Sequence, residues 1–147
     1  MRRRSARGLL WLPLVVGCAY YNAMWSAERS AKEARRLEAR GRTAEARTQW
    51  SRAAVKAETV LARHPKSRWA DDALVLRGEA LTRTGNCAAA ARPLDDALKT
   101  TTTAALTERA ALAAAECALA AGDPVRADRL LASGGAWSDG RRRSRAA

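Results

Sequence analysis

Small and apolar residues recur at fixed distances from three glycines, Gly41, Gly85 and Gly122. Alanine stands five residues after each glycine, a large apolar residue nine after it, and a small residue twelve after it. These positions are Ala46, Ala90 and Ala127, then Trp50, Leu94 and Leu131, then Ala53, Ala97 and Gly134. Because steps of four and three residues stay on one helix face, we expect an amphipathic helix after each glycine.

The pattern continues on the other side of the glycines. A small residue stands seven positions before each glycine, and an apolar residue stands four before it. These positions are Ala34, Gly78 and Ala115, then Leu37, Leu81 and Ala118. Small residues let helices approach closely, and glycine suits the left-handed turn that ends a helix. Each of the three units is therefore predicted to be helix, tight turn, helix.

The whole chain is predicted to be all-α. No stretch alternates apolar and polar residues with period two, and alanine, the best helix former, dominates the apolar residues. We expect helices at about 24–40, 43–63, 68–84, 87–99, 104–121 and 123–133. Ser67 is predicted as an N-cap with Asp71 and Asp72 in the first turns after it, and Asp123 as another. Pro93 is expected to bend its helix.

The first eighteen residues have the order of a secretory signal peptide. Four arginines precede an apolar run over residues 9–16, and Gly17 and Cys18 follow it. The run is too short to cross a bilayer, which takes about twenty residues. A helix packed on the domain would need a polar face, which this run lacks.

The residues Val15-Val16-Gly17-Cys18 resemble a bacterial lipobox. The resemblance implies removal of residues 1–17 and lipidation of Cys18, whose acyl chains would anchor the protein in a membrane. Ala19 after the cysteine resembles the signal for the outer membrane, with the protein facing the periplasm. Tyr20, Tyr21 and Trp25 follow the anchor, and they either lie at the membrane interface or pack on the first hairpin. Trp50 and Trp69 are expected in the core.

The middle unit resembles the tetratricopeptide repeat at its small and apolar positions. These are Leu74, Gly78, Leu81, Gly85, Ala90, Leu94 and Ala97. The stretch "HPKSRWADDALVLRGEAL" is similar to bacterial envelope repeat lipoproteins, among them the outer-membrane assembly lipoprotein and the Tol-Pal coordinator. The resemblance implies a repeat domain over residues 18–133, an α-solenoid of about three units. The change to Gly, Ser and Arg after Ser133 predicts a basic disordered tail at 134–147. The glycines are 44 and 37 residues apart rather than 34, and the usual proline after the second unit is missing.

In that family the first helices of the repeats line a concave face that binds other proteins. The corresponding positions here are Glu28, Ala31, Arg35, Asp72, Val75, Glu79, Thr82, Arg83, Arg109, Leu112 and Glu116. The resemblance implies an extended segment or a helix of another protein as the ligand. An ordinary solvated helix face is the alternative.

Cys87 and Cys117 are expected to lie close together. In stacked hairpins the helix that begins near Cys87 is antiparallel to the helix that ends near Cys117, and the envelope permits disulfides. The two residues are either a disulfide or two buried thiols, and the sequence leaves both interpretations open.

Charge and chemistry add few candidate sites. The net charge is +12, but eight arginines lie in the first seven and last seven residues, and the remainder is mixed. Such a distribution argues against a folded nucleic-acid-binding surface. His64 is the only histidine and has no evident partners for a metal, and no motif indicates a cofactor, a small-molecule substrate or a catalytic group. Asp71-Asp72 and Asp95-Asp96 are expected to be solvated.

The combined expectation is a membrane-anchored adaptor or scaffold of the bacterial cell envelope, bound to other envelope proteins and not an enzyme. Outer-membrane protein assembly is one process in which it would act. Two alternatives stay open: a structural lipoprotein without a ligand in its groove, and a basic-tailed binder of anionic lipid or nucleic acid.

Overall fold

The computed structural model describes residues 12–101 and 103–134, with side chains from residue 22 onward. Six helices follow one another, and no strand occurs in this part of the chain: α1 (Leu12–Ala39), α2 (Thr43–Arg63), α3 (Ala70–Arg83), α4 (Cys87–Thr100), α5 (Ala104–Ala120) and α6 (Pro124–Ser133). The all-α prediction is confirmed. The four N-terminal arginines, the Cys18 side chain and the basic tail beyond Gly134 lie outside the described residues.

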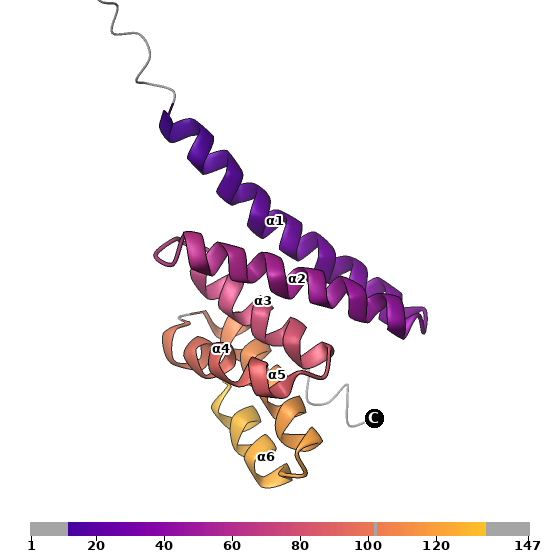
Figure 1. Cartoon of the computed structure of the whole chain (residues 1–147). Helices are drawn as coiled ribbons and strands as arrows, with labels where there is room; N and C mark the ends of the chain where they lie inside the picture. Colours follow the sequence, from indigo (N-terminus) through magenta and orange to yellow (C-terminus); the bar gives the residue numbers. More distant parts are fainter. Residues whose placement is uncertain (1–11, 102, 135–147) are drawn as a thin grey trace, which may run out of the picture.

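The helices form three hairpins stacked in chain order, with α1 and α6 at opposite ends of the stack (Figure 1). Each helix packs on the next one along the chain, and the first helices of neighbouring hairpins also touch, α1 with α3 and α3 with α5. The three helices α1, α3 and α5 are thereby brought together along one side of the stack.

Each hairpin turns at one of the three glycines. Gly41, Gly85 and Gly122 have φ values of 71°, 80° and 75°, the left-handed region that glycine enters without strain. The residue after each glycine donates its amide to the carbonyl four positions before the glycine, at 2.9 Å in all three turns. This repeated bond is the 6→1 hydrogen bond that closes a helix C-terminus. The predicted helix–turn–helix units are confirmed.

The helix starts agree with the sequence at one cap and differ at another. Asp123 caps α6, accepting the Arg126 amide at 2.8 Å, as predicted. The prediction for Ser67 is wrong, because α3 begins at Ala70 and its N-cap residue is Trp69. The amide and carbonyl of Ser67 instead belong to the turn between α2 and α3. Asp71 and Asp72 do lie in the first turn of α3.

Helix α1 differs from its sequence-based expectation. Helix α1 begins at Leu12 rather than near residue 24, so it runs through the segment predicted as the cleavage region. Between Leu14 and Ala39 the sequence has no proline, and Gly17 is its only glycine. Helix α4 has the predicted extent, with Pro93 in its interior.

The core is built at the repeat positions. The alanines five and twelve residues after the first two glycines are at most 1% exposed, and Trp50 and Leu94 are 1% exposed. Gly78 lies directly against Leu94, since a Cβ at Gly78 would be 2.4 Å from Leu94 Cδ2. Trp69 is half-buried against the cluster that contains Trp50. Among the described residues, no helix is both long enough and apolar enough to cross a membrane.

Candidate protein-binding face

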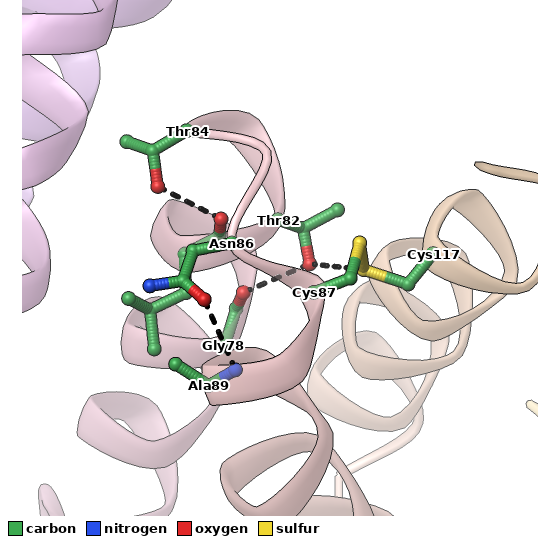
Figure 2. The surroundings of a disulfide bond; sticks show 8 residues. Gly78, Thr82, Thr84, Asn86, Cys87, Ala89 and Cys117 are labelled. Carbon is green, nitrogen blue, oxygen red and sulfur yellow. Dashed lines mark hydrogen bonds between the residues drawn. A yellow bond between two sulfur atoms is a disulfide. The ribbon is translucent and has the colours of Figure 1, made fainter. Parts of the chain in front are cut away.

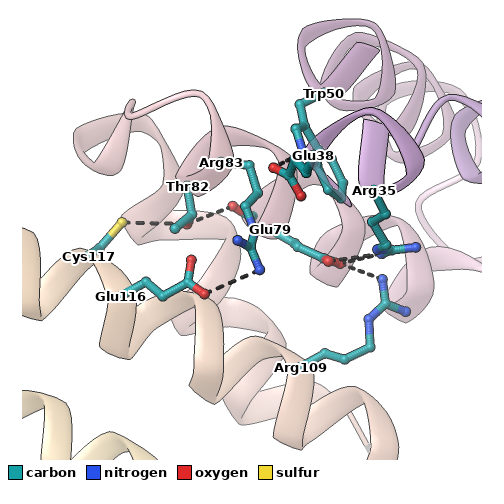
Figure 3. Close-up of polar contacts among 10 residues, drawn as sticks. Arg35, Glu38, Trp50, Glu79, Thr82, Arg83, Arg109, Glu116 and Cys117 are labelled. Atoms are coloured by element: carbon teal, nitrogen blue, oxygen red, sulfur yellow. Dashed lines mark hydrogen bonds and ion pairs between the residues drawn. The ribbon is translucent and has the colours of Figure 1, made fainter. Parts of the chain in front are cut away.

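Glu79 of α3 lies at the centre of the side formed by α1, α3 and α5. Its carboxylate accepts hydrogen bonds from Arg35 of α1, at 2.9 and 3.0 Å, and from Arg109 of α5, at 2.7 Å (Figure 3). The Glu79 side chain is 14% exposed, whereas both arginines are more open to solvent. One carboxylate therefore joins three helices from three successive hairpins.

The ion pairs control the protonation of Glu79. Burial alone would raise the pKa of this carboxyl, because desolvation disfavours the charged form. The charge of Arg109 and the hydrogen bonds from Arg109 and Arg35 outweigh that effect and hold the pKa below its ordinary value. Glu79 is therefore ionised at neutral pH and its charge is shared by two guanidinium groups.

A second ion pair lies beside the first. Arg83 of α3 approaches Glu116 of α5 at 3.3 Å, and both side chains are about two-fifths exposed. Burial raises the pKa of Glu116, the charge of Arg83 lowers it, and the nearby charges of Glu79 and Glu38 raise it again. The net direction is upward. Glu116 thus holds its negative charge less readily than Glu79 does.

Arg35 and Glu38 connect this network to the core. The indole nitrogen of Trp50 donates to Glu38 at 2.8 Å, and the Arg35 guanidinium lies over the Trp50 ring, 5.2 Å from its centre. Glu38 was not among the residues predicted for this face. A buried indole N–H needs an acceptor. The polar residues of the helix before Trp50 were therefore the candidates from which Glu38 could have been predicted.

A small pocket opens between α3 and α5. It has a volume of about 130 Å³ and is lined by Glu79, Arg83, Arg109, Leu112, Ala113 and Glu116. Five of these six residues were predicted for the binding face. The pocket offers two carboxylates, two guanidinium groups and one leucine, a set suited to non-covalent recognition of one or two side chains.

Three predicted face residues lie elsewhere. Val75 is fully buried in the core between α3, α4 and α5, and Ala31 is fully buried between α1 and its neighbours. Thr82 is 9% exposed and donates to the Gly78 carbonyl at 3.0 Å. These three cannot contact a ligand, because Val75 and Thr82 are covered where α3 packs on α1, α2, α4 and α5, and Ala31 is covered where α1 packs on its neighbours. Glu28 lines a different groove along α1, and Asp72 lines neither that groove nor the pocket between α3 and α5.

Cys87 and Cys117 form a disulfide, one of the two arrangements that the sequence left open. The Cα atoms are 5.4 Å apart, and the bond joins the start of α4 to the last turn of α5. The Thr82 hydroxyl lies 3.4 Å from the Cys117 sulfur (Figure 2). The bond thus ties the second hairpin to the third at the edge of the face formed by α1, α3 and α5.

The described residues contain no group of three His, Cys, Asp or Glu side chains that could hold a metal ion. The charged residues of the candidate face are engaged with one another as ion pairs, and this arrangement provides hydrogen bonding and charge for binding.

Comparison of the chain with protein-family models, curated proteins and solved structures finds no match.

Proposed function

We propose that the chain is a bacterial envelope lipoprotein of the tetratricopeptide-repeat type that acts as an adaptor. Lipidated Cys18 would hold the domain at a membrane. The face made by α1, α3 and α5 would bind a segment of a partner protein. Anchoring raises the local concentration of the domain relative to partners in the same membrane. Outer-membrane protein assembly is one process that would use such an adaptor.

The observation that carries the proposal is the convergence of predicted face residues. Arg35, Glu79, Arg83, Arg109 and Glu116 are far apart in the sequence, yet ion pairs join them in two adjacent groups on one side of the stack. The disulfide supports an exported location, because disulfides persist in oxidising compartments. The sequence of residues 1–18 supports the anchor.

One observation favours the structural alternative. The Glu79 carboxylate is already satisfied by two arginines, so the centre of the face could serve only to hold three hairpins together. A purely structural lipoprotein would leave this face without a ligand.

A crosslinking experiment separates the two candidates. A photo-reactive amino acid would replace Leu112, in the pocket, or exposed Ala88 on α4 as the matched control. An adaptor predicts one discrete protein adduct from position 112 in intact cells and none from position 88. The adduct should disappear when Arg83→Glu reverses the charge beside the pocket. Equal adducts from both positions, or none from either, would contradict the adaptor.

The anchor is tested separately. The N-terminal peptide of protein extracted from membranes should begin at Cys18 and carry the mass of attached acyl chains. A peptide that begins at Met1, or at an unmodified Cys18, would refute the anchor.

A further inference from the structure

The excess of positive over negative charge in residues 22–134 lies in the first hairpin. Residues 22–63 hold ten lysines and arginines against five acidic residues, whereas residues 64–134 hold nine of each. The face formed by α1, α3 and α5 does not account for this excess, because most of its charges are paired. The excess therefore needs a separate explanation.

Most of the basic residues of α1 lie in one line on its outer side. Trp25, Arg29, Lys32 and Arg36 follow at steps of four, three and four residues, which keeps them on one helix face. Arg40 follows four residues later, in the turn directly after the helix. All five are exposed, and they lie opposite the buried positions of α1. We call this set the α1 stripe. Helix α1 is at the end of the stack and packs only on α2 and α3 among the described helices.

The charges of the α1 stripe are poorly balanced within the domain. Arg29 lies over the Trp25 ring, 5.3 Å from its centre, and Arg36 approaches Glu33 at 3.7 Å in an exposed pair. Lys32 and Arg40 contact no carboxylate among the described residues. Glu28 and Glu33 flank the α1 stripe on the same helix, and the Arg36–Glu33 pair is the only ion pair they form with it among the described residues. Exposed ion pairs of this type hold little energy, so most of the positive charge of the α1 stripe stays available to a partner.

We propose that the α1 stripe lies against the anionic lipid headgroups of the membrane. A row of basic side chains next to an anionic bilayer is attracted to its surface, and each contributes to binding. The row from Trp25 to Arg40 is about 22 Å long, at 1.5 Å per residue, which suits a flat surface better than a point ligand. An open groove of about 850 Å³ beside it offers donors from Ser26, Gln49 and Lys56 to headgroup phosphates, and its lining also includes the carboxylates of Glu28 and Glu33.

Trp25 favours a lipid surface over a nucleic acid. It is 51% exposed, so the first hairpin does not bury it. It occupies the end of the α1 stripe nearest Cys18, which precedes Arg29 by three turns of the same helix. Indole rings favour the membrane interface, because the apolar part of the ring faces the lipid tails while its N–H faces water and headgroups. The inference rests on the proposed anchor in one respect, since the anchor is what places the chain at a membrane.

This orientation leaves the candidate protein-binding face accessible. Adjacent residues of a helix are about 100° apart around its axis, so Arg35 lies roughly a quarter turn from Arg36 of the α1 stripe. With the α1 stripe on the membrane, α1 lies parallel to the surface and Arg35 points along it. The face formed by α1, α3 and α5 then opens sideways, toward proteins in or near the same membrane.

Binding of the full-length chain to lipid vesicles tests the inference. The chain is made without lipidation and mixed at low salt with vesicles of phosphatidylcholine, alone or with phosphatidylglycerol. The test variant removes the four charges of the α1 stripe: Arg29→Gln, Lys32→Gln, Arg36→Gln and Arg40→Gln. The control variant removes four exposed charges from α4 and α6: Arg92→Gln, Lys99→Gln, Arg126→Gln and Arg129→Gln. Thermal unfolding of both variants checks that they remain folded.

We expect the test variant to bind the anionic vesicles on the order of 100-fold more weakly than the wild-type chain, and the control variant to lose less than about 5-fold. Binding to phosphatidylcholine alone should be the same for all three. Equal losses of vesicle affinity in the two variants would show that binding depends only on the net charge of the chain, and this would overturn the inference. So would wild-type binding by the test variant.

A duplex DNA probe separates lipid recognition from general attraction to polyanions. If the test variant lost affinity for DNA as steeply as for the anionic vesicles, the assignment to lipid would be overturned. The result does not depend on lipidation, because the chain used is unacylated. An unmodified Cys18 in cells together with a selective loss in the test variant would refute the anchor and leave the α1 stripe standing.

Discussion

At the scale of single residues, Gly78 is a position where an added methyl group would meet a buried side chain. A Cβ there would lie 2.4 Å from Cδ2 and 2.6 Å from Cγ of Leu94, whose side chain is 1% exposed and has no room to turn away. We expect Gly78→Ala to lower the free energy of unfolding by about 1–2 kcal/mol. The loss would occur although alanine is the better helix former by about 1 kcal/mol. Denaturant unfolding measures it.

The same substitution in a Leu94→Ala background is the control. With the leucine side chain gone, the added methyl group meets open space and only the helix preference of alanine remains. Gly78→Ala should then be neutral or raise the free energy of unfolding by up to about 1 kcal/mol. An equal loss in both backgrounds would show that the contact with Leu94 is not the cause.

The sequence predicted close helix packing at Gly78 but did not predict which neighbouring positions of α3 stay exposed. The repeated small position seven residues before each glycine indicated close helix approach, and the structure has it. Val75 and Thr82 were assigned to the binding face by resemblance to a repeat family, and both are buried. The exposed strip of α3 is narrow because α1, α2, α4 and α5 all pack on this helix. Its width depends on how the hairpins rotate against one another, which a single helix pattern does not encode.

At the scale of helices, the Glu79 network should make the packing of α1, α3 and α5 depend on pH. The pKa of Glu79 is lower in the folded chain than its ordinary value near 4.5. The stabilisation is therefore complete above that value and is lost as pH falls through the lower folded pKa. We expect Glu79→Gln to cost about 1–2 kcal/mol of unfolding free energy at pH 7 and less as the pH falls below about 4.5. Denaturant unfolding across this range measures the difference.

Glu116→Gln is the matched control, since its pKa shift has the opposite sign. The folded chain raises the pKa of Glu116, so its charge at neutral pH works against folding and protonation relieves it. Glu116→Gln should leave the stability at pH 7 unchanged or slightly higher. A loss at pH 7 as large as that of Glu79→Gln would contradict the assignment of the two carboxyl groups.

The helix positions were more predictable than the contacts between helices. Three glycines at positive φ set the hairpins, and their positions in the sequence identified α2, α4 and α6 to within a few residues. The start of α1 was missed, because an apolar run before a cysteine was interpreted by its export pattern rather than its helix propensity. The link between Glu38 and Trp50 was missed as well, since it depends on how α2 lies on α1.

At the scale of the whole molecule, apolar bulk decreases from the first hairpin to the third. The cluster around α1, α2 and α3 contains Trp50, Leu76 and Val60, all at most 1% exposed. The buried members of the cluster between α5 and α6 are all alanines, and α6 packs only on α5 among the described helices. Burial of a large side chain contributes about 1.5–3 kcal/mol, so the third hairpin has the least stabilisation of its own.

The Cys87–Cys117 disulfide compensates for this weakness, because it ties α5 to the better packed second hairpin. The bond closes a loop across 30 positions of the chain, and such a loop contributes about 3–4 kcal/mol by restricting the unfolded state. We expect the variant Cys87→Ala/Cys117→Ala to exchange the amide hydrogens of α5 and α6 much faster than the wild-type chain, while α1 and α2 keep their protection. Native-state hydrogen exchange read by mass spectrometry measures both. An equal acceleration in all six helices would show instead that the domain opens as one unit, with no weaker end for the disulfide to hold.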